Sequence, residues 1–100
     1  MSLTELYLVT IITERILRDD ILERVKELGA TGFTLTDATG RGSRGIRASD
    51  WEGQNVKIEM VVSKEVGDKI IDYIADSFFE HYAVITYAHP IKVVRGDKYI

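Results

Sequence analysis

The chain has 100 residues, a formal net charge of −3 and no cysteine. This length suits one domain, and 45% hydrophobic with 29% charged residues is typical of a soluble globular protein. The lack of cysteine excludes disulfides and thiolate chemistry and fits a reducing compartment, so we expect a cytoplasmic protein. The acidic balance argues against a nucleic-acid partner, and no apolar run approaches the ~20 residues of a membrane span.

The first part of the chain predicts a strand, a helix and a second strand. Residues 6–12 are apolar and β-branched, which is typical of a central strand. Thr13 is a candidate helix cap, and Glu14 would suit the first helical turn. Residues 33–37 alternate between apolar and polar side chains and predict a half-buried strand. Over residues 15–28, apolar side chains recur at helical spacing before Gly29: Ile16, Leu17, Ile21, Leu22, Val25 and Leu28.

The rest of the chain repeats this pattern in the order strand, helix, strand. Residues 55–62 alternate cleanly, and Ser63 can cap a second helix whose interior Gly67 costs some stability. Residues 82–87 form another apolar strand, which Pro90 interrupts or places at a sheet edge before residues 92–95 resume extended chain. The apolar side chains of the second helix are Val66, Ile70, Ile71, Ile74 and Phe78.

This order predicts a single α+β domain over residues 1–100 with the ferredoxin-like β-α-β-β-α-β arrangement. Right-handed crossovers place both helices on one face of a four-stranded antiparallel sheet. Because the strands carry apolar residues on both sides, the second face also needs a cover. Self-association is the simplest way to provide it.

A basic loop interrupts this otherwise acidic chain between the second and third strands. Residues 39–47 read Thr-Gly-Arg-Gly-Ser-Arg-Gly-Ile-Arg, and no carboxylate lies between Asp37 and Asp50. Glycines let the backbone approach a ligand closely, and consecutive N–H groups of such a turn can bind an anion. Arginine adds a planar fork that binds phosphate oxygens in pairs. We therefore hypothesise a nucleotide-phosphate site, with a solvated hairpin tip as the alternative.

The residues also resemble a known family. The stretch 32–42, Gly-Phe-Thr-Leu-Thr-Asp-Ala-Thr-Gly-Arg-Gly, resembles a motif of the PII signal-transduction proteins, and residues 55–62 and 91–95 are similar to strands of that family. Residues 13–17, 40–47 and 82–87 resemble more particularly the PII-like branch found with bicarbonate transporters and carboxysome genes. The resemblance implies a non-enzymatic homotrimer that binds AMP, ADP, ATP or cyclic AMP in clefts between subunits.

The resemblance also assigns roles to individual residues. Residues 41–54 would form a short T-loop that changes order with the nucleotide and docks onto a transporter, such as a bicarbonate transporter, or an enzyme. Those expected to face the phosphates are Gly40, Arg41, Gly42, Ser43, Arg44 and Arg47. The base and ribose would lie near Ile85, Tyr87, Lys92 and Arg95. Partner docking would use Asp50, Trp51 and Glu52.

The sequence departs from the standard PII pattern in two places, and each departure removes one family property from what the resemblance implies. The loop is short and has no tyrosine at the uridylylated position, so we do not expect control by uridylylation. A glycine-rich, lysine-containing loop before the last strand is replaced by Phe-Glu-His-Tyr at residues 79–82. We therefore do not expect tight binding of Mg-ATP with 2-oxoglutarate, and a role for Mg²⁺ is left open.

Other kinds of chemistry fit the sequence less well. A small phosphatase resembling acylphosphatase would need a glycine-rich cradle near Thr13-Glu14-Arg15, and none is present. A metal-tolerance-type trimer would use His81 or His89, but two histidines alone make no metal site. Ser43 has no nearby base for nucleophilic catalysis. The pair Asp19-Asp20 is more typical of solvated charge on a helix than of acid–base catalysis.

Overall fold

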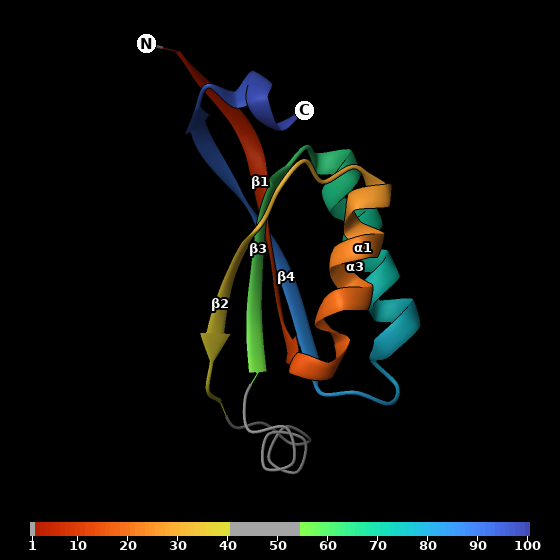
Figure 1. Ribbon diagram of the computed structural model, residues 1–100. Coiled ribbons are helices and arrows are strands. Elements are labelled where there is room, and N and C mark those ends of the chain that lie inside the picture. The colour runs from red at the N-terminus through yellow and green to blue at the C-terminus, as the bar shows by residue number, and fades with distance from the viewer. Residues whose placement is uncertain (1, 41–54) are drawn as a thin grey trace.

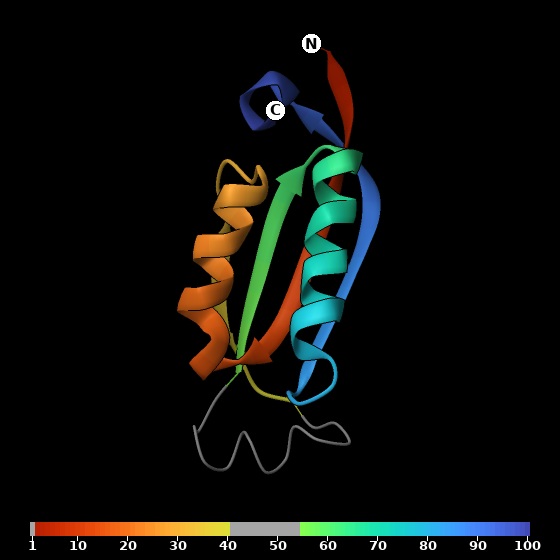
Figure 2. The ribbon, with the colours of Figure 1, turned by 90° about the vertical axis from the view of Figure 1, so that its right-hand side faces the viewer.

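The computed structural model describes residues 2–40 and 55–100. Its elements are β1 (Leu3–Glu14), the 3₁₀ turn η1 (Arg15–Leu17), α1 (Arg18–Leu28), β2 (Thr34–Ala38), β3 (Asn55–Val62), α3 (Lys64–Phe78), β4 (Val84–Val94) and the 3₁₀ turn η2 (Gly96–Tyr99). The strands form one antiparallel sheet in the order β2-β3-β1-β4. Both long helices cover the same face of that sheet (Figures 1 and 2). The predicted ferredoxin-like fold is confirmed.

Strand β1 is the centre of the sheet and extends beyond the predicted residues 6–12 at both ends. It pairs with β3 along one edge and with β4 along the other. Thr13 and Glu14 belong to these ladders, so the prediction that they begin the helix is wrong. The chain passes through η1 before α1 starts at Arg18, and α1 has no side-chain cap.

The core lies between the sheet and the two helices. Burial in β3 alternates along its whole length, as the sequence predicts. The helices cover these side chains with residues at helical spacing, of which Ile21, Ile70 and Ile74 are fully buried. Fully burying one such side chain contributes roughly 1.5–3 kcal/mol. The pattern predicts Ile16 in the buried stripe, but it is 62% exposed: the chain forms η1 there, and of the two apolar side chains in this turn only Leu17 is buried.

Helix α3 begins as predicted. The Ser63 hydroxyl oxygen accepts a hydrogen bond from the Val66 backbone N–H at 3.2 Å. Gly67 lies buried against β1, where an added Cβ would be 3.3 Å from Val9 Cγ2. Gly67 therefore lowers the intrinsic stability of α3 but allows this helix to approach the sheet closely.

Strand β4 is an edge strand that runs without a break through Pro90, which pairs with Tyr7 of β1. An edge position suits proline, because its missing N–H deprives only one side of the ladder. Of the two alternatives for Pro90, the edge is confirmed and the interruption is wrong. The strand also starts at Val84 and not at residue 82.

The second face of the sheet is uncovered in the described chain (Figure 1). Paired residues on neighbouring strands point to the same face, so the register identifies this one. Its apolar side chains include Leu8 and Ile12 of β1, Val61 of β3, and Ile85, Tyr87 and Ile91 of β4. Ile85 is 53% and Tyr87 42% exposed. Strand β2, expected to be half-buried, is exposed along almost its whole length because it is the other edge strand.

The turn after α1 gives a first testable prediction. Gly29 has φ +124°, and an added Cβ would lie 2.9 Å from Val66 Cγ2. We expect Gly29→Ala to lower the free energy of unfolding by about 1–3 kcal/mol, measured by urea denaturation. The control is Gly32→Ala, because a Cβ at Gly32 would meet no atom within 4 Å. Equal stability of the two variants would contradict this account of the turn.

Candidate functional site

The basic loop leaves the fold at one end of the sheet, where β2 stops and β3 begins. Ala38 and Asn55 are paired there, so the two ends of the loop start side by side (Figure 1). Gly40 is exposed, and a Cβ on it would meet nothing within 4 Å. No neighbour among the described residues therefore requires a glycine at this position. The other predicted loop residues lie outside the described residues: Arg41, Gly42, Ser43, Arg44, Arg47, Asp50, Trp51 and Glu52.

Three consecutive residues at the junction of β1 and η1, Thr13, Glu14 and Arg15, contact the segments around this loop base. The Glu14 carboxylate accepts a hydrogen bond from the Ala83 backbone N–H at 2.7 Å. The Thr13 hydroxyl donates to the carbonyl oxygen of the same Ala83 at 3.5 Å. Arg15 Nη2 contacts Asp37 Oδ1 at 2.7 Å, near the end of β2. The residue before β4 and the end of β2 are thus both held at the junction of β1 and η1.

The residues predicted to surround the base and ribose are divided between two places on β4. Ile85 and Tyr87 lie on the uncovered face, beside Ile12 and Thr10 of β1, in the half of the sheet that carries the loop base. Lys92 instead pairs with Glu5 near the start of β1. Glu5 and Glu14 lie at opposite ends of this long strand, a separation that corresponds to about 30 Å.

Arg95 lies even farther along, directly after β4, where it adopts a left-handed conformation with φ 63° before η2. Figure 1 shows that η2 and the start of β1 occupy the end of the sheet opposite to the loop base. One subunit therefore does not bring Lys92 and Arg95 to Gly40. A site that contains both groups needs residues from two subunits.

The candidate metal ligands are not clustered. His81 lies in the turn after α3, whereas His89 lies in the middle of β4. Among residues 2–40 and 55–100, no three His, Cys, Asp or Glu side chains are placed to hold a metal ion. Asp19 forms an ion pair with Arg18 at 3.0 Å and, with Asp20, occupies the first turn of α1. Carboxylates stabilise a helix at that position, which explains this pair without catalysis.

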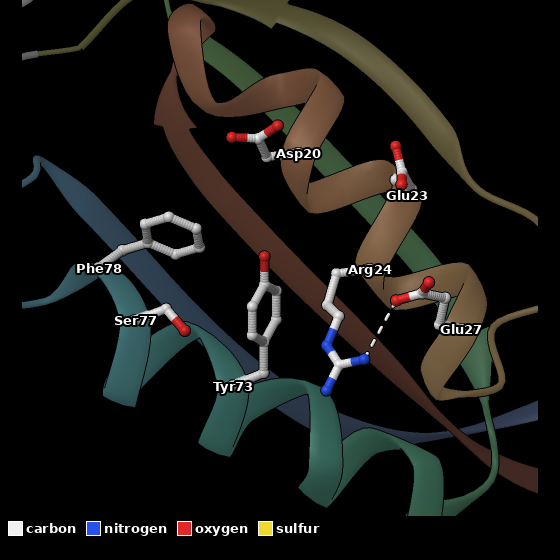
Figure 3. Close-up of a pocket in the computed structure, with 7 residues that line it drawn as sticks. All are labelled: Asp20, Glu23, Arg24, Glu27, Tyr73, Ser77 and Phe78. Carbon is white, nitrogen blue, oxygen red and sulfur yellow. Dashed lines mark hydrogen bonds and ion pairs between the residues drawn. The ribbon is translucent and has the colours of Figure 1, made fainter.

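A groove of about 390 Å³ lies between the two long helices, on the opposite side of the sheet from the open face. Figure 3 shows the Tyr73 ring rising from α3 toward α1, with the Arg24 guanidinium beside it. Arg24 lies 5.9 Å from the ring centroid and contacts Glu27 at 3.1 Å. The groove is also lined by Asp20, Glu23, Ser77 and Phe78. Because its arginine is already paired within the subunit, we assign no function to this groove.

No helix in the described parts of the chain combines the length and the apolar character that crossing a membrane requires.

Comparison with known proteins identifies relatives of this arrangement. The model of the family described as nitrogen regulatory protein P-II matches residues 6–98. The nitrogen regulatory protein GlnK2 of Haloferax mediterranei is 38% identical over 74 residues, a region that spans 62% of this chain and 60% of that protein.

The solved structures that resemble this chain include PII-like proteins. A PII-like signalling protein from Thermus thermophilus is 51% identical, with both chains covered completely and a TM-score of 0.88. CPII from Thiomonas intermedia, in a structure with ADP and bicarbonate, is 24% identical with a TM-score of 0.86. That match covers 99% of this chain and 98% of CPII, and at this identity it shows the shared fold.

Local sequence patterns indicate the contacts around the loop base only in part. The residue types of Thr13 and Glu14 predict a helix start, whereas the structure uses both side chains to hold Ala83. Ala83 is about 70 residues away in the chain, so no local pattern could identify it as their partner. Asp37 is the last carboxylate before the basic loop, but nothing in the sequence pairs it with Arg15.

Tyr73 in the groove gives a second prediction. Burial raises the pKa of Tyr73 above 10.0, and the Asp20 carboxylate adds to the effect. Because the folded-state pKa exceeds the unfolded value, neutral Tyr73 stabilises the fold at lower pH, and this contribution disappears as the pH rises through the raised pKa. Above pH 10, we expect Tyr73→Phe to lose stability less steeply than the wild type in urea denaturation. Parallel pH profiles would contradict this.

Proposed function

The chain belongs to the nitrogen regulatory protein P-II family, and we propose that it is a PII-like sensor of adenine nucleotides. The P-II family consists of signalling proteins and not of enzymes, in agreement with the expectation from the sequence. The observation that carries the nucleotide proposal is the glycine- and arginine-rich stretch of residues 39–47 at the junction of β2 and β3. The structures of CPII with ADP and AMP support the choice of ligand.

The chemistry of the loop suits a phosphate chain. Three arginines, Arg41, Arg44 and Arg47, bring fixed positive charge into a segment without carboxylates before Asp50. Charge-assisted hydrogen bonds from guanidinium to phosphate are about twice as strong as neutral ones. Gly40, Gly42 and Ser43 add a backbone that can approach the phosphate oxygens closely, together with a hydroxyl donor. The alternative of a solvated hairpin tip assigns no role to this concentration of like charge.

The separation of the site residues supports a homotrimer with ligand clefts between subunits. Ile85 and Tyr87 expose apolar surface on the open sheet face, which a neighbouring subunit would cover. Lys92 and Arg95 lie about 30 Å from the loop base in the same subunit. In the proposed assembly these two cations come from the neighbour and complete the cleft for base, ribose and phosphates.

Signalling then requires the loop to respond to the ligand. Residues 41–54 gain phosphate contacts only in the nucleotide-bound state, so the ligand biases the loop toward one arrangement. Asp50, Trp51 and Glu52 would present that arrangement to a partner, and tryptophan is common at the energetic centre of interfaces. We propose a cytoplasmic protein whose partner is a membrane transporter, with a bicarbonate transporter as the first candidate because residues 40–47 resemble that branch.

Nucleotide binding is the third prediction. We expect calorimetry to detect binding of at least one of AMP, ADP, ATP and cyclic AMP. Arg44→Ala should weaken it roughly 10- to 100-fold, because a charge-assisted hydrogen bond contributes about 1.5–3 kcal/mol. The matched control is Arg18→Ala on α1, whose guanidinium is paired with Asp19. Failure of all four nucleotides to bind, or unchanged binding by Arg44→Ala, would end the proposal.

Trimer formation is the fourth prediction. Leu8 lies near the middle of the open face, between Val61 and His89. We expect light scattering to give three subunits for the wild type, and Leu8→Glu to shift the protein toward monomers because a trimer would bury that charge. The control is Ile16→Glu, an equally drastic change at an exposed position of η1 outside the sheet. A wild-type monomer at micromolar concentration would contradict the assembly.

A further inference from the structure

One tripeptide holds two segments that are distant in sequence. Thr13, Glu14 and Arg15 form the end of β1 and the first residue of η1, and each makes a side-chain contact to another element. We call these three residues the bracket. Through it, Ala83, directly before β4, and Asp37, near the end of β2, are both held by three consecutive residues.

The contacts to Ala83 replace ladder bonds at the end of the β1–β4 pairing. That pairing ends with Thr13 opposite Val84, so Ala83 lies one residue beyond it. Thr13 donates to the Ala83 carbonyl oxygen, while the Glu14 carboxylate accepts from its N–H. Both polar groups of this residue are thereby satisfied by adjacent side chains. A charged acceptor makes the second contact a strong one, and losing it would leave a part-buried N–H unpaired.

The contact to β2 has a different character. The Arg15 and Asp37 side chains are 33% and 68% exposed, and such surface ion pairs contribute only about 0–1 kcal/mol. Asp37 belongs to an edge strand that pairs on one side only, with Val56 of β3. Even a weak ion pair can therefore affect the position of the residues just before Gly40. In that part of β2, backbone hydrogen bonds come from β3 alone.

We propose that the bracket is a positioning element of the ligand cleft: it sets the spacing between the base of the phosphate-binding loop and the start of β4, where Ile85 and Tyr87 lie. This inference rests on the proposed nucleotide function. Arg15 acts through Asp37 and does not contact the ligand. A displacement of β4 on ligand binding can be transmitted to the loop base through one continuous path: Ala83, Glu14, Arg15 and Asp37.

The test uses both partners of the exposed pair. We expect Arg15→Gln and Asp37→Asn each to raise the Kd for ADP about three- to fivefold in calorimetry, in line with the value of a surface pair. The charge-reversed double variant, Arg15→Asp with Asp37→Arg, should regain most of the wild-type affinity. The matched control is Arg24→Gln, which breaks a similar exposed pair with Glu27 within α1 and should leave the Kd unchanged (Figure 3).

A direct phosphate contact by Arg15 would give another pattern. In that case Arg15→Gln would still weaken binding, but Asp37→Asn would strengthen it, because a competing carboxylate would be gone. The reversed pair would then fail to restore affinity. This opposite response of the two single variants would overturn the proposal. So would unchanged affinity in both of them.

A second readout does not depend on nucleotide. Amide hydrogen exchange followed by NMR on the ligand-free protein should be faster at residues 36–40 in Arg15→Gln, and normal in the reversed pair. The Ala83 amide should exchange faster in Glu14→Leu, which lacks an acceptor, than in Glu14→Gln, which keeps one. If wild type binds no nucleotide, the proposed function fails, whereas unchanged exchange at both places would show that the bracket itself positions nothing.

Discussion

The pairing of β1 on both edges is the constraint on which the rest of the structure depends. Its ladder with β3 extends from Tyr7 to Glu14, and its ladder with β4 from Leu3 to Thr13. Because side chains alternate along a strand, this double pairing directs Val9 and Ile11 into the core and Leu8 and Ile12 to the open face. A shift of register by one residue would exchange these two sets, so the fold and the open surface are fixed together.

The open face links the fold to the proposed assembly. A single layer of helices covers a sheet whose strands are apolar on both sides, so folding of one subunit leaves hydrophobic surface in water. Exposed side chains such as Ile85 would be a liability in a monomer, whereas they favour association when a second copy covers them. Lys92 lies at the end of the sheet opposite to the loop base, so a cleft that contains both would also need a second subunit. By its pairing with Glu5, Lys92 points to the helix side of the sheet, so contact on the open face accounts for the exposed apolar side chains but does not by itself bring Lys92 to a loop base.

Local patterns predicted the elements whose environment is local or strictly periodic. The alternation of β3 and the Ser63 cap of α3 were correct because a two-residue period and a cap depend on nearby residues. Thr13 and Glu14 were misassigned because threonine and glutamate serve equally well at a helix start and at a strand end. Non-local contacts, to Ala83 and to the strands on either side, determine that these residues end a strand and do not begin a helix. The predicted roles of the arginine loop beyond Gly40 concern residues outside the described ones and stay predictions.

In the proposed sensor, the bracket would connect the loop base to the start of β4 at the other edge of the sheet. A ligand can shift an equilibrium only by as much as its contacts differ between two states. A weak pair such as Arg15–Asp37 is suited to that purpose, since little free energy separates its formed and broken arrangements. The Glu14–Ala83 contact is part-buried and stronger, so in this proposal it would keep the start of β4 in place while the exposed pair responds to the ligand. A strong hydrogen bond from Glu14 and a weak ion pair from Arg15 would thus let the start of β4 stay fixed while the loop base moves.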